Sequence, residues 1–409
     1  MRSEPYRRGV DPRWARLVGV PTVDRELVTG AGLDVGAVEA LVGRARREVD
    51  AGLLPACQVA LARNGEVVLD ATFGDAVPTD RFVVFSCTKA ITAAAIWRLL
   101  SDGRLSTDQR VAEVIPEFGS HGKDVVTVEQ LLTHTAGFPS ARLGPPEWGN
   151  SSSRLERIRD WRLEWEPGTR FEYHPTSANW VLAELISAVA GVDHRTFMRR
   201  ELLEPMGLRS TLFGADPLAN PPPSVAARPV QIVGDPPTSA ELEELGDMGR
   251  QLAELVERVS YDERVIYGEP DTIRIGAPAG GVVSTAADMA RFYQAVMNDN
   301  GELFDPDVLR SAIGEIACDL PDGQRGCPAH RGLGIVIAGD DGFAPMRGFG
   351  ASVSAEAFGH DGAGGQIAFG DPASGLSMTY LTDGQDLNLM REWGRSNAVA
   401  TLAGRCVSS

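Results

Sequence analysis

A serine and a lysine stand three positions apart in the segment Ser86-Cys87-Thr88-Lys89. An apolar lead precedes them and an Ala-rich run follows, so the pair falls at the start of a helix expected over 86–100. Residues three apart on a helix share a face, which lets the amine reach the hydroxyl. Serine needs a neighbouring base to take its proton, and burial among apolar residues favours the neutral amine that can do so. The pair therefore has the residue types of a nucleophile and its base.

Taken alone, Ser-x-x-Lys is a weak signal, because a helix-capping serine followed by an exposed lysine has the same pattern. Other catalytic motifs are absent from the sequence: there is no Gly-x-Ser-x-Gly, His-Glu-x-x-His, Walker or EF-hand pattern. The Gly-rich run 359–365 precedes a strand rather than a helix, which argues against a dinucleotide site. The Ser/Lys pair is thus the leading candidate for chemistry.

The elements that must position this pair follow from periodicity and turn signals. Asn64-Gly65 is typical of a hairpin turn, Thr285 to Asp288 has the pattern of a capping box, and the Pro-rich stretch 215–240 reads as a loop. Helical patterns predict helices over 35–50, 86–100, 241–258, 285–296 and 390–402. Strand patterns predict strands over 57–62, 66–70, 332–337, 366–369 and 376–381.

Strands therefore lie near both ends of the chain and helices fill the middle. This order predicts an α+β fold with one mainly antiparallel sheet flanked by helices, and a mainly helical domain inserted into it. We expect an irregular N-terminal arm over 1–34, a sheet domain formed by 35–103 and 276–409, and the inserted helical domain over 104–275.

Composition and charge narrow the function classes. The chain has 409 residues and a net charge of −17, with no long basic run, which argues against nucleic acid or an anionic membrane as partner. No apolar stretch approaches the roughly 20 residues of a membrane span, and the N-terminus is polar, so we expect a cytoplasmic protein. Five cysteines without an export signal favour free thiols, although Cys318 and Cys327 could pair across a short loop.

Several segments around the Ser/Lys pair resemble the β-lactamase-like serine hydrolases, which include class C β-lactamases, serine DD-peptidases and esterases of the same fold. The likeness extends over roughly residues 50 to 390. It rests on blocks that occur in the family's order: 86–95, 102–106, 131–138, 166–173, 279–288 and 358–362. This resemblance implies the β-lactamase/DD-peptidase fold, with an active site between the sheet and the helical domain, and no need for a metal or cofactor.

The resemblance also implies roles for single residues. Ser86 matches the nucleophile that forms an acyl-enzyme, Lys89 the partner that activates it, and Tyr173 the tyrosine that shuttles protons. A nearby cation favours a phenolate, which suits that last role. His360 and Gly362 match the third motif, Lys-Thr-Gly or His-x-Gly. The backbone N–H groups of Ser86 and Ala363 would form the oxyanion hole.

Two departures from the lactamase pattern bear on the substrate. Tyr173 is followed by His174 and Pro175 where lactamases have Tyr-x-Asn, and His360 replaces the lysine of the third motif. Both changes resemble the esterase branch, so we expect hydrolysis of a small carboxylic ester. Two alternatives stay open: an amide, β-lactam or D-amino-acid peptide hydrolase or acyltransferase on the same fold, and a catalytically silent ligand-binding scaffold. A homo-oligomer also stays open.

Three other polar residues lie near these motifs, and two of them are interpreted as structural. His134 is expected to bond a loop backbone, and Cys87 to pack inward as a small apolar residue. His174 is carried as a candidate contact to substrate, although neighbouring side chains on an extended segment point apart.

Overall fold

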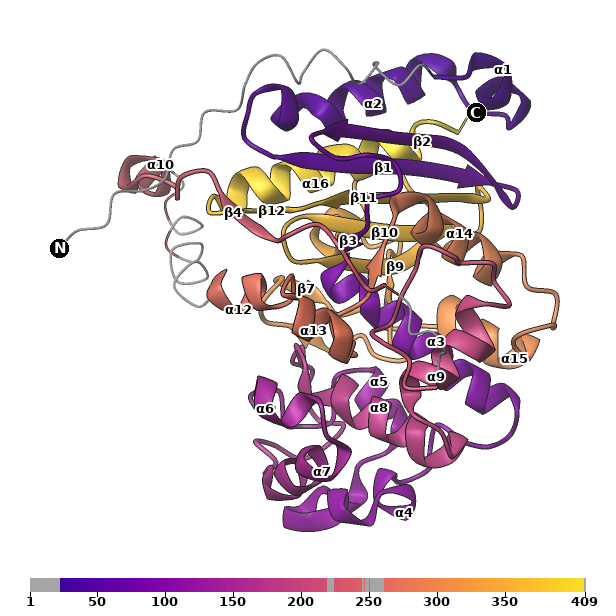
Figure 1. Ribbon diagram of the computed structural model, residues 1–409, viewed down its shortest axis with the longest axis vertical. Coiled ribbons are helices and arrows are strands. Elements are labelled where there is room, and N and C mark those ends of the chain that lie inside the picture. Colours follow the sequence, from indigo (N-terminus) through magenta and orange to yellow (C-terminus); the bar gives the residue numbers. More distant parts are fainter. Residues whose placement is uncertain (1–22, 219–223, 245, 247–249, 251–260, 408–409) are drawn as a thin grey trace.

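The computed structural model describes residues 23–218, 224–244, 246, 250 and 261–407. Its centre is an antiparallel sheet of six strands in the order β2-β1-β11-β10-β9-β8 (Figure 1). Two strands come from the N-terminal part of the chain and four from the C-terminal part, which confirms the predicted α+β fold. The strands are β1 (Ala56–Arg63), β2 (Glu66–Gly74), β8 (Val336–Ile337), β9 (Phe358–Gly362), β10 (Gln366–Asp371) and β11 (Leu376–Thr382).

The β1–β2 hairpin turns at Asn64 and Gly65, as predicted. Their φ angles are 53° and 86°, in the left-handed region that a two-residue hairpin turn of this type requires. A register shift between Leu61 and Ala62 adds an irregularity to the pairing of the two strands.

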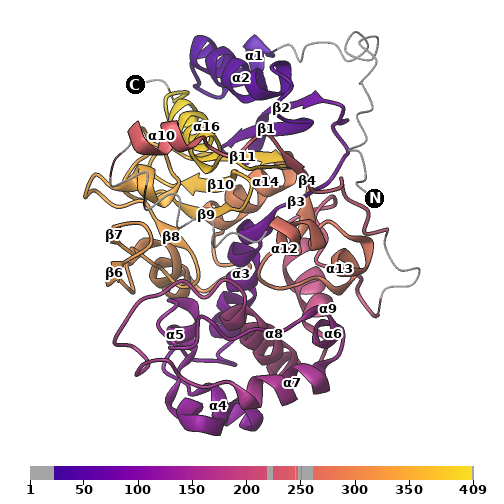
Figure 2. The same ribbon diagram turned by 90° about the vertical axis from the view of Figure 1, so that its left-hand side faces the viewer.

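Helices cover both faces of the sheet (Figures 1 and 2). On one face lie α2 (Val35–Asp50) and α16 (Leu389–Gly404), and on the other lies α14 (Ala286–Met297). Side chains alternate along the strands, so Val59 packs toward α2 and α16 while Ala60 packs toward α14. The side chain of Asp34 accepts a hydrogen bond from Ala37 N at 2.7 Å, so α2 begins with a capped first turn.

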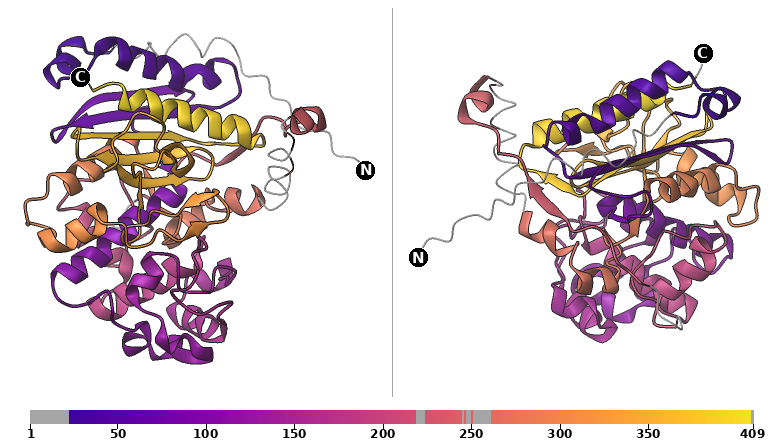
Figure 3. Two further views of the ribbon diagram at one scale, coloured as in Figure 1. Left: turned by 180° about the vertical axis from the view of Figure 1, so that it is seen from behind. Right: turned by 45° about the horizontal axis from the view of Figure 1, so that its top comes forward.

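Helix α3 (Thr88–Ser101) connects the sheet layer to the helical part of the chain (Figure 2). It is buried almost all round, because the sheet layer lies on one side and the helical part on the other. Seen from behind, the helical part lies below the sheet layer (Figure 3). Its helices are α4 (Val111–Val114), α5 (Val128–Leu132), α6 (Pro145–Trp148), α7 (Ser151–Asp160), α8 (Ser177–Ala190) and α9 (His194–Met198).

Two segments expected to be irregular contain short regular elements. Within 1–34, α1 (Arg25–Gly30) begins at an aspartate whose carboxylate accepts two backbone N–H bonds. Within 215–240, β4 (Gln231–Val233) pairs in parallel with β12 (Gly384–Asp386). Helix α1 depends on a single cap, and β4 depends on a partner strand that is distant in the sequence. Hydrophobic periodicity over a short window therefore did not reveal either element.

The capping box predicted at the start of α14 is only half formed. Thr285 Oγ1 accepts a hydrogen bond from Asp288 N at 3.3 Å. The Asp288 carboxylate does not return the bond; its Oδ2 accepts from Ser210 N at 2.6 Å instead. The aspartate therefore ties α14 to the loop after α9.

Two further predictions differ in length from the structure. The strand expected over 332–337 is reduced to β8, because Gly334 adopts a φ of 86° and breaks the extended run. The helix expected over 241–258 begins earlier, as α10 (Ser239–Glu244), and the remainder falls almost entirely outside the described residues. The predicted helix over 390–402 is confirmed as α16.

All five cysteines are buried free thiols, as the sequence favoured. Cys327 lies in β7 (Cys327–Pro328), which forms a small hairpin with β6 (Pro321–Asp322). Within the described residues, none of the helices combines the length and the apolar character that crossing a bilayer demands.

Candidate active site

Ser86 lies in a 3-10 turn, η2 (Phe85–Cys87), that leads directly into α3. The preceding Phe85 has a φ of 46°, a backbone conformation that costs a non-glycine residue roughly 1–3 kcal/mol. The ring of Phe85 packs against Tyr267 with centroids 5.9 Å apart. This packing holds a strained turn that leaves Ser86 partly exposed at the helix start.

Lys89 lies one turn into α3 and is buried, with 1% of its surface exposed. Its Nζ lies 3.2 Å from Ser86 Oγ and 2.9 Å from the carbonyl oxygen of Ala279. The same segment is bound to α3 at two more points: Val282 N donates to Thr88 Oγ1, and a threonine one turn later donates to the Pro278 carbonyl. The 278–282 segment therefore fixes the position of Lys89 Nζ.

Tyr173 comes from the helical part of the chain, and its hydroxyl lies 3.0 Å from Ser86 Oγ. Its neighbours are anchored to His134: Glu172 N donates to the His134 carbonyl at 3.3 Å, and His174 N donates to His134 Nδ1 at 3.2 Å. His134 is thus a buried residue that bonds loop backbone, as predicted. The structure brings Ser86, Lys89 and Tyr173 together around one oxygen atom.

His174 does not face the same space. Its ring is fully buried; Nε2 accepts from Phe138 N at 3.1 Å and Nδ1 donates to the Glu172 carbonyl at 2.6 Å. Burial lowers the pKa of His174 to about 4, so the ring is neutral near pH 7. Both nitrogens are used by the protein, and the assignment of His174 as a substrate contact is corrected: it joins two loops.

His360 lies on β9 with its ring close to Tyr173, the centroids being 5.9 Å apart. Its Nδ1 lies 2.6 Å from the Asp361 carbonyl oxygen and its Nε2 lies 3.4 Å from Arg331 Nη1. Burial, together with the charge of Arg331, lowers the pKa of His360 to about 3. The third motif therefore places a neutral ring beside Tyr173. Cys87 packs inward as expected, with its Sγ donating to the His360 carbonyl at 3.1 Å.

Gly362 ends β9 where this strand passes the turn that carries Ser86. A Cβ at this position would lie 2.7 Å from the carbonyl oxygen of Val84, two residues before Ser86. Only glycine permits so close an approach. The next residue, Ala363, is thereby placed beside the turn that carries Ser86.

The loop after β9 is held from the C-terminal side of the sheet. Gly364 and Gly365 both adopt a φ of 83°. The carbonyl oxygen of Ala363 accepts from Gln385 Nε2 at 3.5 Å, and that of Gly364 accepts from Arg395 Nη2 at 3.1 Å. These contacts restrict the backbone that carries the Ala363 N–H.

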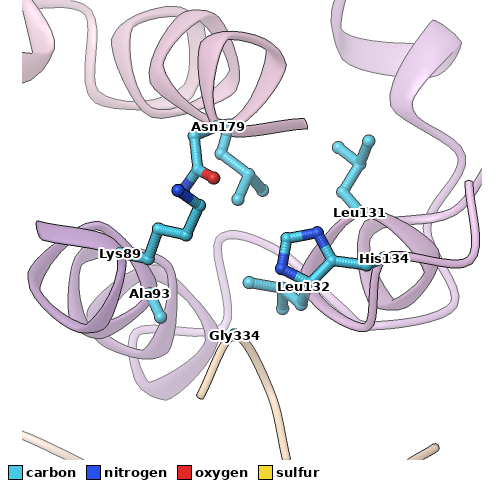
Figure 4. A pocket seen from close by; sticks show the side chains of 8 residues that line it. Lys89, Ala93, Leu131, Leu132, His134, Asn179 and Gly334 are labelled. Atoms are coloured by element: carbon cyan, nitrogen blue, oxygen red, sulfur yellow. The ribbon is translucent and has the colours of Figure 1, made fainter. Parts of the chain in front are cut away.

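Two side chains at the site were not singled out from the sequence. Asn179, on α8, faces a cavity behind Lys89; Figure 4 shows its amide beside the end of the lysine and the His134 ring across the cavity. Asn179 lies six residues after Tyr173, whereas the Tyr-x-Asn pattern has its asparagine two residues after the tyrosine. Arg331 lies against Tyr173 and His360. The cavity is lined by Lys89, Ala93, Leu131, Leu132, His134, Asn179, Leu182 and Gly334.

A six-stranded antiparallel sheet covered by helices, with a Ser-x-x-Lys helix between it and a helical part, defines the class of β-lactamase-fold proteins. The sequence model of the Beta-lactamase family matches residues 42–401, and the chain belongs to this family.

Relatives agree with that placement. The chain is 29% identical over 313 residues to the esterase/beta-lactamase LipL of Mycobacterium tuberculosis, covering 73% of this chain and 68% of that protein. Among solved structures, a penicillin-binding protein homolog from Caulobacter crescentus superposes with a TM-score of 0.67 at 26% identity, covering 91% of this chain and 98% of that one. A family VIII carboxylesterase shares the fold with a TM-score of 0.70 at 20% identity, covering 92% and 99% of the two chains.

Proposed function

We propose that this protein is a serine hydrolase that cleaves small carboxylic esters through an acyl-enzyme on Ser86. One observation carries the proposal: Ser86 Oγ lies within hydrogen-bond distance of both Lys89 Nζ, at 3.2 Å, and the Tyr173 hydroxyl, at 3.0 Å. A serine that contacts one group able to accept its proton and a second able to pass a proton to the leaving group has the arrangement of an activated nucleophile.

In the first half of the reaction, Ser86 Oγ attacks the ester carbonyl carbon while its proton passes to the amine of Lys89. The carbonyl oxygen takes the negative charge, and the N–H groups of Ser86 and Ala363 donate to it. When the carbonyl re-forms, the bond to the alkoxide breaks and the Tyr173 hydroxyl supplies the proton that the leaving group needs.

In the second half, Tyr173 takes a proton from a water molecule, and the resulting hydroxide attacks the acyl carbon. The bond between Ser86 Oγ and that carbon breaks, the acid leaves, and the serine recovers its proton from Lys89. Every group is then in its starting state, and the cycle requires only water as co-substrate.

Three features support an ester over an amide. An alkoxide or phenoxide leaves more readily than an amide nitrogen and needs less help from a proton donor. His360, at the third-motif position, is neutral and offers no charge to a substrate carboxylate. The name of LipL includes an esterase activity. That name also includes β-lactamase, so hydrolysis of a β-lactam is the alternative outcome of a substrate panel.

The test combines turnover and labelling. Wild-type protein should release p-nitrophenol from short-chain esters, and mass spectrometry should locate a fluorophosphonate adduct on Ser86. Ser86→Ala should lose both, with turnover reduced by several orders of magnitude. Ser152→Ala, which changes an exposed serine on α7, is the matched control and should retain both. A folded Ser86→Ala protein that keeps more than a tenth of wild-type turnover would refute the assignment.

A further inference from the structure

Arg331 is a buried arginine at the site that the reaction scheme leaves without a role. Only 2% of its surface is exposed. Its guanidinium carbon lies 5.4 Å from the ring centroids of both Phe171 and Tyr173, and its Nη1 lies 3.4 Å from His360 Nε2. Its Nε has no hydrogen-bond partner among the residues that the structure describes.

The charge of Arg331 lacks a carboxylate in direct contact. Within the described ranges of the chain, no carboxylate lies within 4.0 Å of its guanidinium nitrogens, whereas Arg325 nearby binds Asp361 through two contacts of 2.8 and 3.0 Å. Burial lowers the pKa of Arg331 to about 10, so the side chain is still protonated at neutral pH. A buried cation without a direct partner is costly, and such a cost is typical of functional sites.

The charged and titratable groups around Tyr173 come from several elements. Lys89 lies 5.1 Å from its ring centroid, and the imidazoles of His134 and His360 pack against it. Burial lowers the pKa of both histidines well below neutral, so neither supplies charge. Arg325 and the buried phenol of Tyr267 also interact with it electrostatically, and Arg325 is neutralised by Asp361. The charge of Lys89 changes during the proposed cycle; that of Arg331 does not.

We propose that Arg331 is a positioning residue that keeps a permanent positive charge beside Tyr173, so that the tyrosine oxygen can hold negative charge between giving a proton to the leaving group and taking one from water. It does so from the loop before β8, while the third-motif position carries a neutral histidine. This inference rests on the proposed hydrolase function and adds a second, constant charge to that of Lys89, which holds the serine proton while the tyrosine is anionic in that scheme.

The variants Arg331→Gln and Arg331→Lys separate charge from packing. The readout is kcat between pH 5 and 10 on a short-chain naphthyl ester, with active sites counted by fluorophosphonate labelling. Arg331→Gln should move the acid limb of the kcat profile to higher pH by about one unit or more, so that activity falls about tenfold or more near pH 7 and recovers at alkaline pH. Arg331→Lys should keep the limb within about half a unit of wild type.

A second arginine provides the control for packing. Arg154 is also buried and lies 5.2 Å over the ring of Trp180, but it is paired with Glu184 in the helical part. Arg154→Gln should lower the thermal midpoint without moving the pH profile.

Three outcomes are distinguishable. A kcat profile of Arg331→Gln that superimposes on wild type, with only a lower thermal midpoint, would show that Arg331 is structural and overturn the inference. An equal shift in Arg331→Lys would show that charge is not the cause and also overturn it. A wild-type protein that neither cleaves the ester nor labels at Ser86 would instead refute the proposed function itself.

Discussion

Lys89 Nζ lies 2.9 Å from the carbonyl oxygen of Ala279, although 190 residues separate them in the chain. With the 3.2 Å contact to Ser86 Oγ, this bond orients the amine from two sides. A lone lysine on a helix has several rotamers, and fixing one of them costs conformational entropy that the second acceptor offsets. The 278–282 segment therefore acts on Ser86 through the lysine.

Lys89→Arg should abolish activity despite the conserved charge. Arginine cannot accept the serine proton at any working pH, and its larger head does not fit among the alanines of α3. We expect kcat/KM on a short-chain ester to fall by about a thousandfold or more. The chain contains one other lysine, Lys123, buried against backbone carbonyls in the helical part, so Lys123→Arg is the control. A near-normal rate for Lys89→Arg would reduce Lys89 to a structural residue.

The protein should hydrolyse esters in preference to cephalosporins if the proposed function is correct. The neutral His360 and the proline at 175 remove two charge-assisted or amide contacts, each worth about 1.5–3 kcal/mol at most. We expect kcat/KM for a short p-nitrophenyl ester to exceed that for a chromogenic cephalosporin by about a hundredfold or more, measured on one preparation. Comparable values would contradict this prediction and would mean that another group at the site recognises the lactam.

His174→Leu should affect stability rather than substrate binding. The substitution leaves the buried Phe138 N–H without its acceptor, which costs about 1–3 kcal/mol of unfolding free energy. Because the ring does not face the substrate, KM should stay within about twofold of wild type. His121→Asn, at an exposed histidine, should change neither. A large rise in KM with an unchanged unfolding free energy would contradict this reading.

Acid should destabilise the protein before its carboxylates titrate. Burial lowers the pKa of His174 and His194 from 6.5 to about 4. Between these values the unfolded chain binds protons that the folded one does not, so the unfolding free energy falls as the pH drops from 6.5 toward 4. Each such histidine contributes a slope of up to about 1.4 kcal/mol per pH unit.

His194 is a convenient probe of this effect because neither of its ring nitrogens has a hydrogen-bond partner among the described residues, and its Nδ1 lies 3.8 Å from Asp193 Oδ1. His194→Leu should reduce the slope of unfolding free energy against pH by about one proton, measured by urea denaturation at several pH values. An unchanged slope would mean that His194 is protonated in the folded state.

The α+β order, the hairpin at Asn64-Gly65 and the pairing of Ser86 with Lys89 could all be predicted from the sequence. Each depends on residues that are close together in the chain, where helical spacing or turn chemistry dictates geometry. Tyr173 and the third motif were reached only through resemblance, because no local rule links them to a serine 87 or more residues away.

The surroundings of His174, Asn179 and Arg331 were decided by the tertiary structure. A histidine next to Tyr173 is indistinguishable in sequence from a substrate contact, and the burial of its ring against Phe138 settles the matter. Asn179 lines the same cavity as Lys89 because α8 packs against α3, and Arg331 reaches Tyr173 because the loop before β8 lies beside the helical part. The sequence determines which side chains are present and which nearby residues share a face of a helix or strand. Only the packing of distant segments determines which of these side chains meet in one site, and which buried charges have no carboxylate in direct contact.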